Sequence, residues 1–247
     1  MTNPEFVVVV PALHFPSEDG GIDVRLTRRY AETAASTWVD RFILSGSTTR
    51  GDLLTCEQRA NVLDLWLEVT TPDRLLACCW VPADHDVAAA RQIAPMGVMR
   101  GLDDPDAALG YLQRLPVEGF VYSHPMFGKA VFDSTLAAAS RERRALPRGG
   151  KLAKITQEEI TLVRREAGSE FDLWDGSSRR IEASLRSGAS GVVATPLCVF
   201  ETPFPNRQPA AVQRHVDRVQ DVLDQLPDRA TRSAELLTRA RAGLTRS

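Results

Sequence analysis

Lysine is scarce in this chain. Of its 247 residues, lysine and arginine together number 30, yet only Lys129, Lys151 and Lys154 are lysines. Arginine stays protonated and cannot form an imine, whereas a lysine amine can act as a nucleophile. Lys151 and Lys154 share one short apolar segment, 150–156, which predicts a strand. One hypothesis is that a primary amine is needed inside that strand; the alternative is that the two side chains face opposite sides and one simply extends to solvent.

Several other features are also lacking. The net charge of −2 argues against a general nucleic-acid binder. No apolar run reaches the ~18 residues of a membrane span, and residues 1–5 lack the basic start of a signal peptide. The four cysteines show no CxxC spacing, which is typical of small core residues in a reduced compartment. We therefore expect a cytoplasmic protein that binds neither nucleic acid nor membrane. The cysteines are Cys56, Cys78, Cys79 and Cys198.

The sequence shows no metal or nucleotide motif. Its four histidines are scattered, with no HxxxH or HxH pair, so no metal site is predicted. His14, His85 and His124 are interpreted as structural or solvent-facing side chains, although His124 is also placed to touch a substrate. The first apolar run leads into His14-Phe15-Pro16 rather than the glycine-rich turn of a dinucleotide-binding fold.

What the chain does contain is a regular alternation of apolar strands and amphipathic helices. Eight such repeats with short connections favour a (β/α)₈ barrel of the TIM type over a doubly wound sheet. We expect a single α/β domain, with the barrel in residues 1–205 and C-terminal helices in 206–247 packed on it. The predicted strands cover residues 6–13, 41–46, 73–80, 96–100, 117–123, 151–155, 171–174 and 191–195. Helices are predicted to start at Asp23, with Val24 on the buried stripe, at Thr55, near Asp86, and at Thr156, which begins a capping-box sequence.

In such barrels the chemistry occurs at the C-terminal ends of the strands. This rule selects the polar residues that follow each predicted strand. They are Ser47, Thr48, Asp84, His85, Tyr122, His124, Lys154, Asp175 and the adjoining Gly176.

Three of these segments resemble the dihydrodipicolinate synthase and N-acetylneuraminate lyase family of class I aldolases. The GST at 46–48 with LLTCEQR at 53–59 is similar to the family's GTTGE…LT..ER, and YSHP at 122–125 is similar to Y-N-x-P. LAKIT at 152–156 is similar to G-[IV]-K-x-[TS], the strand that carries the Schiff-base lysine. Weaker matches occur at 11–13 and 188–193. The order of the matches is that of the family over nearly the whole chain.

The resemblance implies a Schiff-base lyase or aldolase that needs no cofactor. Lys154 would form an imine with pyruvate or a related 2-oxo acid, Tyr122 would relay protons, and an aldehyde is a possible second substrate. A homo-oligomer, either a dimer or a tetramer, is also implied. The residues expected to bind substrate are Gly46, Ser47, Thr48, Arg50, His124 and Val193.

The chain also departs from the family pattern. Thr49-Arg50 replaces the Gly-Glu of GTTGE, and Phe127 occupies a position where the family often has arginine. The second relay tyrosine has no evident counterpart, because Tyr30 and Tyr111 fall on predicted helices. These changes favour specialised or catabolic metabolism over lysine biosynthesis. The alternative hypothesis is a degenerate barrel that has lost the chemistry and binds ligands or regulates.

Overall fold

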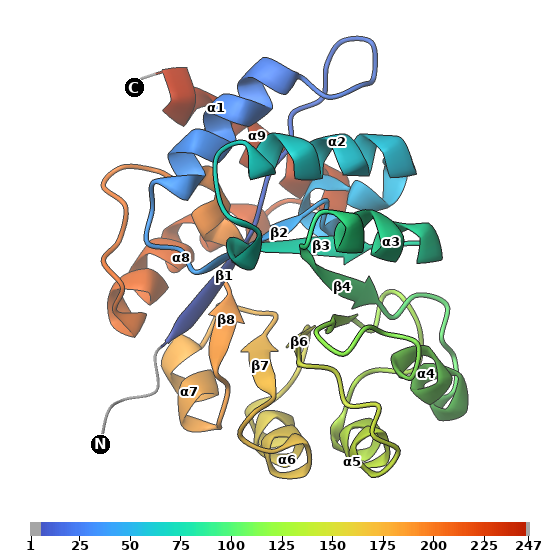
Figure 1. The fold of residues 1–247 in the computed structure, drawn as a ribbon. Helices are drawn as coiled ribbons and strands as arrows, with labels where there is room; N and C mark the ends of the chain where they lie inside the picture. The colour runs from blue at the N-terminus through green and yellow to red at the C-terminus, as the bar shows by residue number, and fades with distance from the viewer. Residues whose placement is uncertain (1–5, 246–247) are drawn as a thin grey trace.

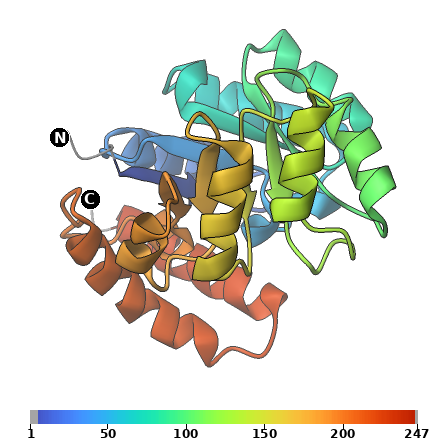
Figure 2. The same cartoon turned by 90° about the horizontal axis from the view of Figure 1, so that it is seen from below.

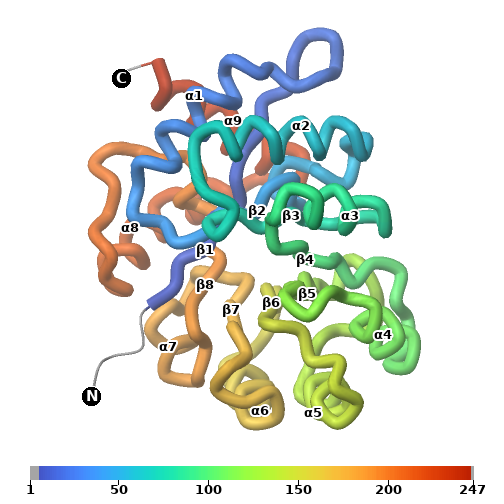
Figure 3. Tube along the Cα trace, viewed as in Figure 1, coloured from blue at the N-terminus to red at the C-terminus, as the bar shows by residue number. Residues whose placement is uncertain are grey.

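The computed structural model describes residues 6–245 and contains a closed barrel of parallel strands in the order β1 to β8, with β8 pairing back to β1. Helices surround this ring (Figures 1 and 3). The strands are β1 (Val7–Pro11), β2 (Arg41–Leu44), β3 (Leu75–Cys79), β4 (Ala94–Val98), β5 (Phe120–Ser123), β6 (Gly149–Leu152), β7 (Asp172–Asp175) and β8 (Gly191–Val193). The predicted TIM barrel is confirmed. The segment 1–5, where the sequence lacks a signal-peptide pattern, lies outside the described residues.

Each strand is followed by a helix or helical turn, and the predicted helix starts are mostly confirmed. Asp23, Thr55 and Thr156 each accept a hydrogen bond from a backbone N–H in the first helical turn, as N-cap side chains do. At Thr55 the reciprocal bond from Gln58 completes a capping box. The α-helices are α1 (Val24–Ala35), α2 (Cys56–Leu67), α3 (Pro82–Ala90), α4 (Pro105–Leu112), α5 (Ser134–Glu142), α6 (Gln157–Ala167), α7 (Ile181–Arg186), α8 (Pro209–Asp224) and α9 (Arg229–Thr245).

Some predicted boundaries are wrong. Helix α3 begins at Pro82 rather than Asp86, since proline fits the first turn of a helix. Val24, expected on the buried stripe of α1, is half exposed. Strand β6 ends at Leu152 rather than Ile155 because residues 153–155 form the turn that leads to the Thr156 cap. This shift changes which lysine lies inside the barrel.

The barrel interior is filled by alternate side chains of the strands. Every strand except β6 contributes to one buried apolar cluster. That cluster contains Val9, Ile43, Leu76, Cys78, Trp80, Met96, Val98, Phe120, Tyr122, Trp174 and Val193. At β6 the corresponding inward positions are Gly149 and Lys151, which pair with Phe120 and Tyr122 of the neighbouring strand. An amine therefore occupies the place where the other strands supply apolar groups.

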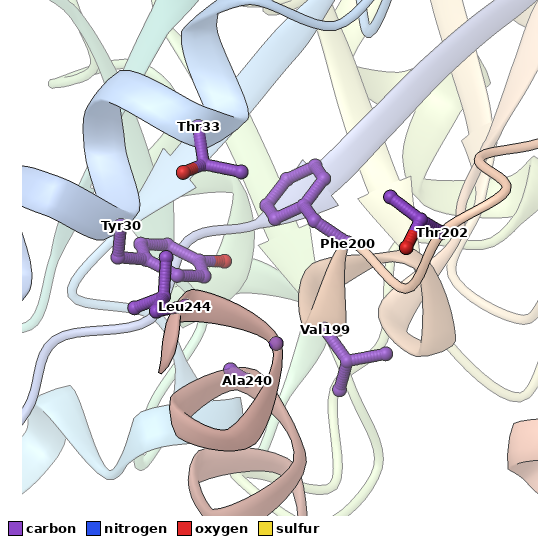
Figure 4. Close-up of a pocket in the computed structure, with 8 residues that line it drawn as sticks. Tyr30, Thr33, Val199, Phe200, Thr202, Ala240 and Leu244 are labelled. Carbon is purple, nitrogen blue, oxygen red and sulfur yellow. The ribbon is translucent and has the colours of Figure 1, made fainter. Parts of the chain in front are cut away.

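The C-terminal helices cover one side of the barrel wall, as Figure 2 shows from below. Between α1, α9 and the 3₁₀ helix η4 (Thr195–Val199) lies a small cavity of about 110 Å³. Tyr30 of α1, Phe200 after η4, and Ala240 and Leu244 of α9 line it together with Thr33, Val199, Thr202 and Gly243 (Figure 4). This cavity lies outside the barrel and away from the strand ends. Among residues 6–245, no helix is long and apolar enough to cross a membrane.

Alanine substitutions at two glycines test the packing of the barrel, because one should stabilise the protein and the other should destabilise it. Gly243 lies in α9 beside the cavity, where an added Cβ would come no closer than 3.8 Å to the carbonyl oxygen of Val199. Gly243→Ala should raise the free energy of unfolding by about 0.5 kcal/mol, because alanine favours helix. At Gly191 in β8 an added Cβ would lie 2.0 Å from the oxygen of Val7. Gly191→Ala should cost about 2 kcal/mol or more.

Denaturant titration of both variants against the parent chain measures the two effects. A stabilised Gly191→Ala protein would contradict the close contact of β8 with β1, and a strongly destabilised Gly243→Ala protein would contradict the open space beside α9.

Candidate active site

Lys151 lies inside the barrel near the C-terminal ends of the strands. Its side chain is buried at 5% exposure, and its neighbours in register are Tyr122 of β5 and Trp174 of β7, both in the interior cluster. The Lys151 Nζ atom lies 4.0 Å from the centre of the Tyr122 ring. A cation over an aromatic face is electrostatically favoured, which offsets part of the cost of burying the amine. The amine is thus held in one place beside a phenol.

The expected position of Lys154 inside the barrel is wrong. Lys154 is exposed, lies two residues beyond the end of β6, and has a φ of +62° in the left-handed region of a turn. LAKIT matches the end of G-[IV]-K-x-[TS] at Lys154 and Thr156, whereas Gly149-Gly150-Lys151 matches its glycine two residues before a lysine. If β6 extended through Ile155, it would lead directly into the Thr156 cap and leave no residues for a connecting turn. Connections between a strand and the following helix usually contain at least two residues.

Ser47 and Tyr122, both predicted, are brought together by the fold. Ser47 begins the 3₁₀ helix η1 (Ser47–Thr49) after β2, and Tyr122 lies in β5. The Ser47 Oγ and Tyr122 Oη atoms are hydrogen-bonded at 2.8 Å, across 75 residues of sequence. Tyr122 is therefore in contact with Lys151 through its ring and with Ser47 through its hydroxyl. A proton donor or acceptor stands next to the buried amine.

The segment that carries Ser47 has an unusual backbone. Ser45 and Arg50 both have positive φ, at 53° and 58°, a conformation that non-glycine residues adopt at a cost. Gly51 approaches the Ser45 carbonyl so closely that a Cβ would lie 1.8 Å from that oxygen. We call residues 45–54 the substrate loop, after the binding role that the sequence predicts for Gly46, Ser47 and Thr48. One of its carbonyl groups is held from the barrel side, because the Trp80 indole donates to Ser45 O at 2.8 Å.

A buried ion pair supports the other end of the substrate loop. The Arg59 guanidinium of α2 lies 2.9 Å from Asp84 of α3, and both side chains are buried. Arg59 also donates to the carbonyl oxygens of Gly51 and Leu54. Asp84 in turn accepts the backbone N–H groups of Trp80 and Val81. Asp84, a sequence candidate, is therefore a supporting residue rather than a group that faces the amine.

Aromatic side chains surround the phenol at the mouth of the barrel. The Phe127 ring packs edge-on against Tyr122 at 5.5 Å and against Trp80 at 5.4 Å between ring centres. His124 lies 5.5 Å from Phe127, and its Nδ1 accepts the N–H of Met126. Burial, and then the charges of Lys151 and Lys154, lower the pKa of His124 to about 4. His124 is consequently neutral at pH 7.

The remaining candidates lie around the barrel without joining this group. Asp175 ends β7 and is buried; burial raises its pKa, while its carboxylate accepts from the Ser184 hydroxyl and the Ser177 N–H. Gly176 donates its N–H to Leu152 O. Val193 fills the barrel interior, and His85 is partly buried on α3.

Three predicted pocket residues form the turn after β2. Gly46 precedes η1 and its carbonyl accepts from Gly51, Thr48 lies within η1, and Arg50 follows it. The Arg50 Nε atom is buried and has no hydrogen-bond partner among residues 6–245.

Neither spare tyrosine can serve as a second relay in this chain. The Tyr30 hydroxyl donates to Cys198 O on the outer side of the barrel, at 2.8 Å, and burial raises its pKa well above 10. Tyr111 of α4 has its hydroxyl against Gly97 on the outer face of β4. Within residues 6–245, no group of three or more His, Cys, Asp or Glu side chains could hold a metal ion.

Comparisons with known proteins show the fold. No protein-family model matches the sequence, and no curated protein matches it significantly. Solved structures match over almost the whole chain. The 2-keto 3-deoxygluconate aldolase of Picrophilus torridus has a TM-score of 0.78 at 15% identity, covering 96% of this chain and 93% of its own. A dihydrodipicolinate synthase of Bacillus anthracis has a TM-score of 0.75 at 16% identity, covering 97% and 89%.

A sialic acid aldolase of Ruminococcus gnavus has a TM-score of 0.74 at 14% identity, covering 89% of this chain and 80% of its own. The protein is thus a TIM barrel with a buried lysine at the C-terminal ends of its strands. Its fold is that of the dihydrodipicolinate synthase and N-acetylneuraminate lyase family, as the sequence motifs predicted.

His14, which follows β1 and is 6% exposed, predicts acid sensitivity. Burial lowers its pKa from the ordinary 6.5 to about 4. Between these values the unfolded chain binds a proton that the folded chain does not, so stability should fall as pH drops through this window. The contribution of His14 is about 1–2 kcal/mol between pH 6.5 and pH 5. His14→Gln should therefore show a flatter decline, measured by denaturant unfolding at each pH. An unchanged slope would contradict the burial of a neutral imidazole.

Proposed function

We propose that the protein is a class I lyase or aldolase of the dihydrodipicolinate synthase and N-acetylneuraminate lyase family, with Lys151 as its imine-forming residue. The observation that carries this proposal is the contact between the Lys151 amine and Tyr122, whose hydroxyl is bonded to Ser47. Lysine imine chemistry needs an unhindered amine, a nearby proton relay and a site that excludes bulk water. The surroundings of Lys151, near the C-terminal end of β6, support all three requirements.

The first steps can be written with the residues at hand. The neutral Lys151 Nζ attacks the C2 carbonyl carbon of a 2-oxo acid, forming a C–N bond. The former carbonyl oxygen then leaves as water, taking up protons that the Tyr122 hydroxyl can relay through Ser47. Transfer of a proton from C3 of the resulting iminium to the Tyr122–Ser47 pair gives an enamine. The enamine C3 then bonds to the carbonyl carbon of an aldehyde, whose C=O π bond breaks as its oxygen takes up a proton from the same pair. The reverse sequence cleaves that bond, so no metal or organic cofactor is required.

Ser47 and Thr48 support binding of the 2-oxo acid carboxylate. Both residues lie in the turn that follows β2, the strand next to β1. The Ser47 hydroxyl is hydrogen-bonded to the Tyr122 hydroxyl. Hydroxyl and backbone N–H groups at such a turn are suitable partners for a carboxylate. The carboxylate would thereby hold C2 near the Lys151 amine.

The second substrate is proposed to lack a carboxylate at the position next to Phe127. The Phe127 ring is packed against Tyr122 and Trp80, so this wall presents carbon rather than a cation. The neighbouring His124 is neutral at pH 7 and adds no charge. This arrangement supports a role in specialised or catabolic metabolism rather than lysine biosynthesis.

The first test of the chemistry distinguishes the two lysines. Borohydride reduction in the presence of pyruvate, followed by peptide mass spectrometry, should place the reduced adduct on Lys151. Lys151→Ala should abolish the adduct, while Lys154→Ala should retain it because Lys154 is exposed in a turn. An adduct on Lys154 would overturn the assignment. Absence of an adduct with any of a panel of 2-oxo acids, with ligand binding unaffected by Lys151→Ala, would support a degenerate binding protein.

Tyr122→Phe tests the proton relay. Removal of this hydroxyl should lower the rate of imine formation by about 10²–10⁴-fold, the usual range for a lost acid–base group. Single-turnover trapping at saturating pyruvate measures that rate. Tyr111→Phe is the matched control, since its hydroxyl lies on the outer face of β4. Equal rates in the two variants would remove Tyr122 from the mechanism.

A further inference from the structure

The first turns of helix α9, near the C-terminal end of the chain, are attached to the substrate loop. The Ser233 hydroxyl donates to the carbonyl oxygen of Thr48, a contact that joins residues 185 positions apart. One turn earlier, Arg229 Nη2 lies 3.0 and 2.9 Å from the two carboxylate oxygens of Asp52. The substrate loop is therefore bound on its outer side by the C-terminal helix.

These contacts lie close to the reacting groups. Thr48 directly follows Ser47, whose hydroxyl contacts Tyr122 at 2.8 Å. Asp52 lies two residues after Arg50, one of the two positions with positive φ. A backbone held in costly conformations keeps them only when surrounding contacts fix it. Trp80 and Arg59 supply such contacts from the barrel side, and α9 supplies them from the other side.

We propose that Ser233 and Arg229 are positioning residues, which hold the substrate loop so that Ser47 and Thr48 meet the substrate carboxylate beside Lys151. The inference rests on the proposed function for its substrate, but the attachment itself does not. The side chains differ in their setting: Ser233 is buried at 6% exposure, whereas Arg229 and Asp52 are partly exposed. The serine thus sets the position of one carbonyl, and the ion pair restrains the end of the loop.

Ser233→Ala has a close control within the chain. Ser140 of α5 is also a buried helical serine, and both hydroxyls lie within hydrogen-bond distance of the carbonyl oxygen four residues earlier, at 2.9 Å for Ser233 and 2.6 Å for Ser140. The single hydroxyl proton of Ser233 is shared between that oxygen and the Thr48 oxygen. Only Ser233 adds the bond to Thr48. Ser140→Ala therefore removes the shared helical bond, while Ser233→Ala removes that bond and the attachment to the substrate loop.

Two measurements on the full chain test the proposal. Amide hydrogen exchange of residues 45–54, without any ligand, should be faster in Ser233→Ala than in Ser140→Ala. The pyruvate concentration that gives half-maximal borohydride trapping should rise about fivefold in Ser233→Ala, as expected for one lost hydrogen bond, with little change at saturation. Ser233→Thr keeps the hydroxyl and should restore both values.

Arg229→Gln gives a second comparison, in which the substituted side chain is partly exposed and no buried group is removed. Its control is Arg179→Gln, which breaks a surface pair with Asp224 of α8 away from the substrate loop. Equal exchange of residues 45–54 in each variant and its control would overturn the inference, whatever the chemistry of the site. If trapping fails in the parent chain but exchange changes as expected, the proposed function fails and the attachment of the loop stands.

Discussion

The site depends on one constraint, which is the burial of a long amine among apolar side chains. Seven of the eight strands fill the barrel with carbon-rich groups, and β6 alone places Lys151 there. A buried amine is costly unless it has partners. The face of the Tyr122 ring supplies a favourable contact with the Lys151 amine at 4.0 Å. The constraint thereby fixes where the amine lies in the barrel.

Tyr122 connects this amine to the rest of the structure. Its ring meets Lys151 and Phe127, and its hydroxyl meets Ser47. Ser47 belongs to a loop whose backbone is unfavourable by itself and is held by β3, α2 and α9. The proton relay proposed for Tyr122 requires that these distances are maintained. The supporting contacts are therefore part of the site, although none of them touches the amine.

The sequence predicts the barrel well and the site in part. Alternating buried strands and capped helices are local patterns, so Asp23, Thr55 and Thr156 mark helix starts that the structure confirms. The order of the motifs in the sequence predicts Ser47 and Tyr122 as site residues. The contacts of Ser233 could not be predicted, because they join segments 185 residues apart through the packing of α9. Periodicity along one strand carries no information about such contacts.

The two lysines show why the strand pattern of the sequence predicts Lys154 inside the barrel whereas the structure encloses Lys151. Side chains alternate along a strand, so residues three apart face opposite sides of it. This rule applies only when both residues belong to the strand. Lys154 does not belong to it, since the Thr156 cap requires a turn and the chain makes that turn through a left-handed residue. The register of β6 is set instead by its neighbours, where Lys151 pairs with Tyr122 on one side and Trp174 on the other. Both partners face inward, so the amine between them must do the same. The scarcity of lysine correctly pointed to the segment, but only the pairing of three strands identifies which lysine the barrel encloses.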